Sequence, residues 1–287
     1  MNTKELKRWP FPDQEFLGRG SFGNVRRGLY CKSPVAVKEL LAGEEQLPSY
    51  RRQAKTELLQ EIRVLMKLRH PNIVCMIAYD SRYIVMDMYM GNAVKLAHLD
   101  EVAVVGRDCM RGIAFMQLHG KCVLHGDIKP ENILVNVDSY GKIIKAALGD
   151  LGLSRSCAKC LKRKGFVGTA GYMPMPNPVV DSTHDIYALA VSLLDAFLSR
   201  KTGDVHARND SFGLEDNTMD AVSQLPDQDY KNVLSDMLMA YENGAVKRSV
   251  KKRTEFIEKV VVQWENIVSD SNVPAAKITP HSSLSIY

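Results

Sequence analysis

The sequence predicts an α+β fold with two lobes, a small β-rich N-lobe with one helix and a larger, mainly helical C-lobe. Two observations predict this division. In the first 88 residues, glycine turns separate short apolar runs, a pattern typical of strands. From residue 92 onward, apolar residues recur mainly at spacings of three and four, which indicates helices. We expect Gly91 and Asn92 to connect the lobes, with a cleft between them.

Length and composition fit one such domain. The chain has 287 residues, of which 45% are apolar and 25% charged, values typical of globular proteins. We expect a polar leader at 1–13, the domain at 14–268 with its lobes at about 14–88 and 92–268, and a flexible tail at 269–287. The N-terminus is charged, and the longest apolar stretch, residues 186–198, is too short to cross a bilayer. The chain is therefore expected inside the cell, in the cytoplasm, the nucleus or both.

Charge and cysteine usage indicate no special partner. The formal charge of +5 is modest, and the basic clusters at 159–164 and 247–253 are typical of solvated faces, so nucleic-acid binding is not expected. The six cysteines are too scattered for a secreted disulfide framework. Cys157 and Cys160 form a single Cys-x-x-Cys motif, which leaves a redox or metal role open, with His184 as a possible further ligand. Oligomeric state is not indicated.

The N-lobe is expected to contain five strands and one helix. The strands are predicted at 16–17, 25–30, 35–40, 73–78 and 83–88. The helix is predicted at 57–68, where five aliphatic residues recur at spacings of three and four, and Pro71 follows its end.

The C-lobe is expected to be built around two long helices at 102–118 and 186–199. Short strands are predicted between them at 133–137 and 143–147, joined by an extended hairpin turn. A loop rich in glycine and proline follows at 149–180, and the end of the domain, 230–268, is helical.

A glycine-rich turn joins the first two predicted strands. Glycine lets the backbone approach phosphate oxygens closely. In a dinucleotide-binding fold such a turn leads into a helix, whereas here a strand follows, which favours a loop lying over ATP phosphates. The ordinary alternative is a glycine-rich hairpin. The residues of the turn are Gly18, Arg19, Gly20, Ser21, Phe22 and Gly23.

Lys38 ends the apolar strand at 35–40. Burying an ammonium group is unfavourable unless an anion pairs with it. The helix at 57–68 offers Glu57 and Glu61, one turn apart on the same face. The residues alone leave open whether Glu57 or Glu61 is the partner. The simpler interpretation is that Lys38 is a solvated residue at the end of a strand.

Further segments follow in a fixed order. Residues 61–73 read Glu-x-x-x-Leu-x-x-Leu-x-His-Pro-Asn-Ile, residues 125–132 read His-Gly-Asp-Ile-Lys-Pro-Glu-Asn, and residues 150–152 read Asp-Leu-Gly. Residues 168–173 read Gly-Thr-Ala-Gly-Tyr-Met. Together with the glycine-rich turn, these segments resemble the eukaryotic protein kinases of the Ser/Thr subclass, over about residues 14–260. The divergent motifs are similar in style to kinases of large DNA viruses.

The resemblance implies a bilobal protein-kinase-like fold and a role for each polar residue. Glu61 is selected as the partner of Lys38. Asp127 is expected to orient the substrate hydroxyl and accept its proton, and Lys129 to neutralise charge on the moving phosphoryl group. Thr169 is expected to hydrogen-bond both Asp127 and Lys129. The implied activity is transfer of the ATP γ-phosphoryl group to Ser or Thr hydroxyls of protein substrates.

The resemblance also implies ATP and Mg²⁺ as cofactors. Asn132 and Asp150 are the expected metal ligands. Asp185 is expected to cap backbone groups near residues 125–132, the segment that resembles the family's catalytic loop. The residues expected around adenine, for which core packing is an equally good interpretation, are Val25, Ala36, Met86, Asp87, Met88 and Leu134.

Two departures from the family pattern qualify these expectations. Gly126 replaces the arginine that grips an activating phosphate, and residues 157–168 contain no Ser, Thr or Tyr. We therefore expect activity without phosphorylation of that loop, with Ser154 and Ser156 as the remaining acceptors nearby. Residues 174–176, Pro-Met-Pro, replace Ala-Pro-Glu, and Lys252 is expected at the position of the paired arginine. The alternative is a pseudokinase-like nucleotide-binding scaffold.

Overall fold

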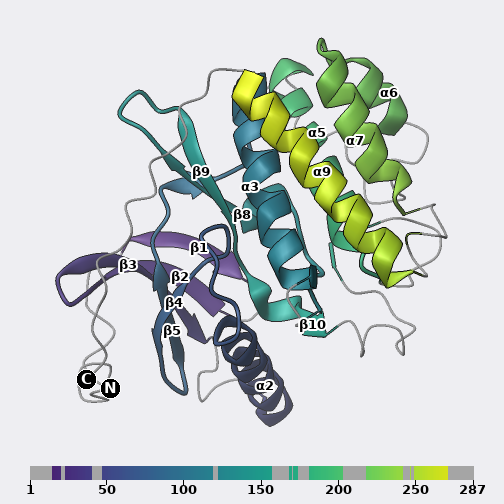
Figure 1. Ribbon diagram of the computed structural model, residues 1–287. Coiled ribbons are helices and arrows are strands. Elements are labelled where there is room, and N and C mark those ends of the chain that lie inside the picture. Colours follow the sequence, from purple (N-terminus) through teal and green to yellow (C-terminus); the bar gives the residue numbers. More distant parts are fainter. Residues whose placement is uncertain are drawn as a thin grey trace, which may run out of the picture.

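The fold combines a small sheet-and-helix lobe with a larger helical lobe, as Figure 1 shows. A computed structural model describes residues 15–20, 23–40, 47–118, 122–156, 168–169, 171–173, 181–202, 218–241, 246 and 249–270. The expected leader at 1–13, the tail from 271 and most of the loop at 157–180 lie outside the described residues.

The N-lobe sheet has five antiparallel strands. In spatial order they are β1 (Phe16–Gly20), β2 (Gly23–Tyr30), β3 (Ser33–Leu40), β5 (Tyr83–Asp87) and β4 (Met76–Tyr79). Val35 and Val37 of β3 pack with β4 and β5 in a small core. Because side chains alternate along a strand, Ala36 and Lys38 point to the opposite face, which is the face toward the cleft.

Helix α2 (Pro48–Leu65) begins well before the predicted start at residue 57. Its first two turns are mostly exposed, so they lack the apolar periodicity that would have indicated a helix. Proline at the first helical position suits the start, since its missing N–H would have no helical partner there. Leu58, Ile62 and Leu65 are buried toward the sheet and the C-lobe, and this packing fixes the face that carries Glu61.

The C-lobe contains the long helices and two small sheets. Its helices are α3 (Leu99–Leu118), α5 (His184–Thr202), α6 (Thr218–Ser223), α7 (Gln228–Met239) and α9 (Val250–Asp270). One sheet has the order β6 (Gly91–Asn92), β8 (Ile133–Val137) and β9 (Ile143–Leu148). The other pairs β7 (Val123–Leu124) with β10 (Arg155–Ser156), and short 3-10 turns lie at Pro130–Asn132 and Leu151–Leu153.

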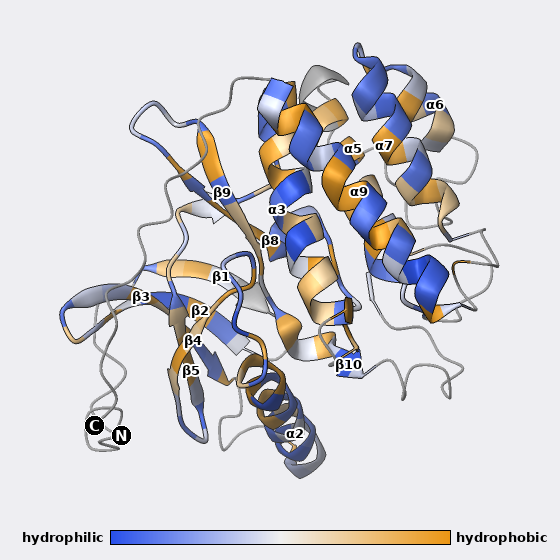
Figure 2. Ribbon diagram, viewed as in Figure 1, coloured by the Kyte–Doolittle hydropathy of each residue, from blue (hydrophilic) through white to orange (hydrophobic). Residues whose placement is uncertain are grey.

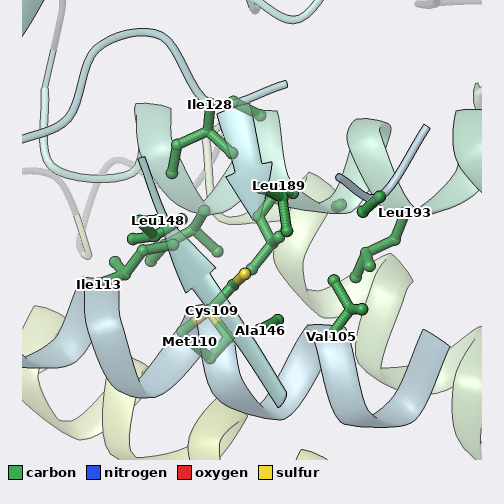
Figure 3. Close-up of a cluster of buried hydrophobic side chains, with 14 of the residues drawn as sticks. Val105, Cys109, Met110, Ile113, Ile128, Ala146, Leu148, Leu189 and Leu193 are labelled. Atoms are coloured by element: carbon green, nitrogen blue, oxygen red, sulfur yellow. The ribbon is translucent and has the colours of Figure 1, made fainter. Parts of the chain in front are cut away.

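The core of the C-lobe lies between α3, α5 and the β8–β9 hairpin. Figure 3 shows Cys109, Met110 and Ile113 of α3 meeting Leu148 of β9 and Leu189 of α5. On the other side of α3, a Cβ at Gly106 would collide with the ring of Trp264, so glycine permits the close approach of α9. Figure 2 shows hydrophobic and hydrophilic residues alternating along α9, as expected for a helix with one buried face. This packed base supports the hairpin that carries the site.

The segment at 72–74 corrects the strand predicted at 73–78. The strand β4 starts only at Met76, and Ile73 instead forms a single parallel bridge with Leu148 of β9. Asn72 donates its side-chain amide to the Ala146 carbonyl over 3.0 Å. Apolar residues are buried equally in a strand or an irregular link, so their pattern could not distinguish the two. The link anchors the N-lobe beside β9, whose end leads to Asp150.

No helix within the described ranges is both long enough and apolar enough to span a membrane.

Candidate active site

A cleft of about 780 Å³ lies between the lobes. Its walls come from β1, β2, β3 and α2 on one side, and from the segment after β5, the 3-10 turn at Pro130–Asn132, β8 and the end of β9 on the other. The predicted site residues that line it are Gly18, Val25, Ala36, Lys38, Glu61, Met86, Asp87, Lys129, Asn132, Leu134 and Asp150. Residues far apart in sequence therefore converge on one cavity.

Lys38 joins the two lobes by pairing with two carboxylates. Its Nζ lies 2.7 and 3.0 Å from the two oxygens of Glu61, and 2.7 Å from Oδ1 of Asp150. Lys38 and Glu61 are only 7% and 3% exposed. Burial alone would lower the pKa of Lys38, but the two carboxylates outweigh it and raise that pKa. The ammonium group therefore stays charged, and it is held at the back of the cleft.

The pKa of Asp150 lies below its ordinary value. Burial acts to raise it, but the charge of Lys38 and the hydrogen bond from its Nζ prevail. Asp150 has a left-handed backbone, with φ of 50°, at the turn after β9. Leu151, which follows, is fully buried in the core, so leucine serves as the packing residue of the turn.

The backbone before Asp127 is held by Asp185 at the start of α5. The amides of His125 and Gly126 donate to its two carboxylate oxygens over 2.8 and 2.9 Å, which is the capping role expected of Asp185. A His125 ring nitrogen lies 2.8 Å from the Gly149 carbonyl oxygen. These bonds fix the loop at 125–132 against the turn that carries Asp150.

The carboxylate of Asp127 is surrounded by donors. Thr169 donates its hydroxyl to Oδ1 over 2.6 Å, and the Asn132 amide and the Lys129 ammonium lie 3.1 and 3.2 Å from Oδ2. Lys129 also donates to the Thr169 hydroxyl over 2.9 Å. Both contacts expected of Thr169 are therefore present. The network fixes the orientation of a carboxylate that is only 7% exposed.

Asn132 and Asp150 offer oxygens of the kind that Mg²⁺ prefers. The Asn132 amide nitrogen donates to the main-chain oxygen and Oδ2 of Asp127, which leaves its side-chain oxygen for a cation. Asp150 binds Lys38 through Oδ1, and its side chain remains 26% exposed. Both residues line the cleft. The donor set therefore fits the expected metal.

The glycine-rich turn is described in part. Gly18 lines the cleft, and Gly23 lines a smaller cavity beside Lys38. A Cβ at Gly23 would collide with the Glu39 carbonyl oxygen, so a side chain does not fit there. Ser21 and Phe22 lie outside the described residues, as does the side chain of Arg19.

The apolar part of the cleft departs from the prediction at one residue. Val25, Ala36, Leu134, Met86 and Asp87 line it, as expected, but Met88 does not belong to the described lining. The lining residues that the sequence argument did not name as site residues are Leu17, Val74, Tyr89, Met90, Gly91, Asn92, Glu131 and Gly149. Strand alternation predicted β5 well, but it gives no information on the irregular segment after Asp87, which contributes Tyr89 and Met90.

Gly126, in the loop at 125–132, and Gly168 lie close to each other. Gly126 has φ of 80° and Gly168 has φ of 125°, conformations that favour glycine. A Cβ at Gly168 would approach the Gly126 carbonyl oxygen to 2.8 Å.

For the second departure from the family pattern, the Pro-Met-Pro segment and its expected partner Lys252, the structure describes only the partner's side. Residues 174–176 lie outside the described residues. In α9, Lys252 is exposed, and it is Arg253 that donates to the Ser182 hydroxyl just before α5, over 3.0 Å. The placement of Lys252 at the position of the paired arginine stays a prediction, because its partner segment lies outside the described residues.

Replacing Thr169 by valine is expected to lower the turnover number about tenfold to a hundredfold, because Asp127 and Lys129 lose the hydroxyl that positions them. Steady-state phosphotransfer kinetics measure the effect. Thr169→Ser keeps the hydroxyl and should retain most of the activity. Equal losses in both variants would contradict the role of the hydroxyl.

Comparisons with known proteins agree with this geometry. The family described as protein kinase domain matches residues 11–264. Similar proteins include a mitogen-activated protein kinase kinase kinase 1a of Physcomitrium patens, 32% identical, and an L-type lectin-domain containing receptor kinase V.9 of Arabidopsis thaliana, 29% identical. The matches cover 63% and 67% of this chain, and 25% and 30% of those proteins. The serine/threonine-protein kinase TAO2 of Rattus norvegicus is 27% identical over 64% of this chain and 15% of its own length. The chain thus spans less than a third of each of these relatives.

Proposed function

Because the chain belongs to the protein kinase domain family, we propose that it is an active Ser/Thr protein kinase that transfers the γ-phosphoryl group of ATP to protein hydroxyls. The observation that carries the proposal is the convergence of Lys38, Glu61 and Asp150 on one cleft, next to Asp127, whose carboxylate contacts the lining residues Lys129 and Asn132. A scaffold that only binds nucleotide has no need of a carboxylate at 127 that three donors hold beside the cleft-lining residues Lys129 and Asn132.

Each polar residue has its own role in the proposed reaction. Lys38, fixed by Glu61, would bind phosphate oxygens, and Asn132 and Asp150 would hold Mg²⁺, which supplies charge neutralisation on the phosphates when bound. Asp127 orients the substrate hydroxyl and accepts its proton. Lys129 stabilises the charge that develops on the transferred group. Val25 and Leu134, which line the cleft, would enclose the adenine of ATP.

The specificity for Ser and Thr rests on Lys129 and Thr169, which are joined by a hydrogen bond of 2.9 Å. In the family resemblance these residues mark the Ser/Thr subclass. The test is to incubate the full chain with Mg²⁺ and ATP labelled at the γ-phosphate, together with a mixture of general protein substrates, and to identify the phosphorylated amino acids. Phosphoserine and phosphothreonine are expected. Phosphotyrosine as the main product would contradict the assignment.

We further propose that activity needs no phosphate on the segment after β10. Residues 157–168 carry no hydroxyl. Of the nearby acceptors, Ser154 is fully buried and donates to the His125 carbonyl over 3.2 Å, and Thr169 is engaged by Asp127 and Lys129. Ser156 in β10 is partly exposed. Where the family pattern has an arginine that would bind such a phosphate, this chain has Gly126.

Treatment of the purified protein with a phosphatase is therefore expected to leave its specific activity unchanged, since no activating phosphate is lost. Phosphotransfer before and after treatment is the measurement, and Ser156→Ala serves as the matched variant for the remaining hydroxyl. Loss of activity on treatment, with a phosphosite mapped between residues 150 and 170, would refute the proposal.

A further inference from the structure

A hydrogen bond joins Tyr172 to helix α5. The Tyr172 hydroxyl donates to Oδ2 of Asp195 over 2.7 Å, and both side chains are partly buried. A hydroxyl that donates to a carboxylate makes a charge-assisted bond, which is roughly twice as strong as a bond between neutral groups. Neither residue belongs to the described lining of the cleft, so any part they have in the reaction is played through other side chains.

A tight turn connects Tyr172 to Thr169. The Tyr172 amide donates to the Thr169 carbonyl oxygen over 3.2 Å. Met173, the next residue, is buried, and its side chain lies against Gly168. A Cβ at Gly168 would approach the Met173 sulfur to 3.1 Å and the Gly126 carbonyl oxygen to 2.8 Å. Thr169 is therefore held from both sides, by the close packing of the residue before it and by its bond to Tyr172.

The helix that receives this bond also holds the loop at 125–132. Leu189 of α5 is fully buried in the C-lobe core (Figure 3), and close packing of this kind keeps a helix rigid. Asp185, at the start of α5, accepts from the two amides that precede Asp127. Asp195 lies further along the same helix. One packed helix therefore positions both segments that meet in the network around Asp127.

We infer that Asp195 and Tyr172 are positioning residues, which keep the Thr169 hydroxyl where it meets Asp127 and Lys129. The hydroxyl has to reach both partners at once, over 2.6 and 2.9 Å. A displacement of about 1 Å would break these contacts, and shifts of that size can lower a rate by a large factor. The inference rests on the proposed function, because its effect is on the transfer of phosphate.

This anchor gives a physical reason for activity without phosphate on the segment after β10. Residues 157–168 carry no hydroxyl, and Gly126 cannot bind a phosphate through a side chain. The bond between Tyr172 and Asp195 needs no modification, because the chain itself supplies the donor and the acceptor. The geometry around Thr169 is thus held permanently, where a phosphate would hold it only after modification.

The first test is Tyr172→Phe, which removes one oxygen and keeps the ring. The turnover number is expected to fall about tenfold, and by no more than in Thr169→Val, because the effect passes through the Thr169 hydroxyl. Calorimetric ATP affinity should stay unchanged. The matched control is Tyr140→Phe, whose side chain is 94% exposed in the turn between β8 and β9, and it should keep full turnover. Wild-type turnover in Tyr172→Phe would overturn the inference.

The second test asks whether these residues act through one another. In a Thr169→Val background, Tyr172→Phe should lower turnover by less than about twofold, since the hydroxyl that it positions is already gone. In an Asp195→Leu background it should likewise have almost no further effect. Melting temperatures establish that each variant is folded. Losses that multiply in these double variants would indicate independent contributions to stability, and they would overturn the positioning role.

The third test separates this inference from the proposed function, because amide hydrogen exchange needs no activity. In Tyr172→Phe the amide of residue 172 should exchange about tenfold faster than in the wild type. The amides of His125 and Gly126, held by Asp185, should keep their rates. Unchanged exchange at residue 172 would overturn the anchor. A wild type that transfers no phosphate would contradict the proposed function, while the difference in exchange would still confirm the anchor.

Discussion

A Lys38→Met variant is expected to lose phosphotransfer from ATP and to lose about 3–5 kcal/mol in free energy of unfolding. Lys38 is the counter-ion of Glu61, which is only 3% exposed. Methionine fills a similar volume but leaves that carboxylate buried without a positive charge. Asp150, whose side chain is 26% exposed, can still be hydrated. Chemical denaturation at neutral pH, together with a phosphotransfer assay, measures both effects.

The pH dependence of this loss has a definite sign. Burial raises the pKa of Glu61, and the nearby charge of Lys38 lowers it in part. Without Lys38 the carboxyl should bind a proton more readily in the folded state than in the unfolded chain. The destabilisation is therefore expected to be largest at neutral pH and to shrink as the pH falls toward about 5. A loss that grows on acidification would contradict a buried, uncompensated Glu61.

The double variant Lys38→Met, Glu61→Leu is the matched control. It replaces the buried pair by apolar side chains, so it should recover much of the lost free energy of unfolding. It should remain inactive, because no cation is left at the back of the cleft. If the single Lys38→Met variant were as stable as the wild type, the ion pair would not have the buried geometry described above.

Replacement of Asp127 by asparagine is expected to reduce the turnover number by a factor of about 10²–10⁴, because the side chain can no longer accept the substrate proton. The shape is preserved, and the amide can still accept from Asn132 and Lys129 and donate to Thr169. The free energy of unfolding should therefore change by only about 1 kcal/mol. ATP affinity should stay unchanged, since Lys38 and Asp150 keep their contacts. Turnover, calorimetric ATP binding and denaturation are the three measurements.

The control for this variant is Asp138→Asn. Asp138 accepts from the amides of Tyr140 and Lys142 in the turn between β8 and β9, and neither it nor those two residues line the cleft. The same chemical change there should leave turnover unaltered. A turnover number of Asp127→Asn within a few fold of the wild type would show that Asp127 is not the proton acceptor.

Much of the site could be predicted because its polar residues occur at fixed spacings. The strand β8 at Ile133–Val137 and the contacts of Thr169 with Asp127 and Lys129 were expected from the order of the motifs and are present. The residues alone could not choose between Glu57 and Glu61, since both lie on one face of α2. In the structure Lys38 reaches Glu61, while one carboxylate oxygen of Glu57 is buried without a partner among the described contacts.

Other features depend on tertiary structure that local patterns do not contain. The segment at 72–74 bonds to β9 rather than extending β4, because the Ala146 and Leu148 backbone groups are available there. The contribution of Tyr89 and Asn92 to the cleft depends on the path of the chain after β5. The pairing of β7 with β10 involves only two residues on each strand, too few for any periodicity to indicate.

The central claim is that this cleft transfers phosphate to proteins, and one measurement tests it most directly. Wild type and Asp127→Asn, shown to be equally folded, are incubated with Mg²⁺ and ATP labelled at the γ-phosphate, and labelled phosphate on serine and threonine is quantified. We expect steady incorporation by the wild type and a rate lower by a factor of about 10²–10⁴ for the variant. Equal incorporation by both proteins, or none by the wild type, would contradict the claim.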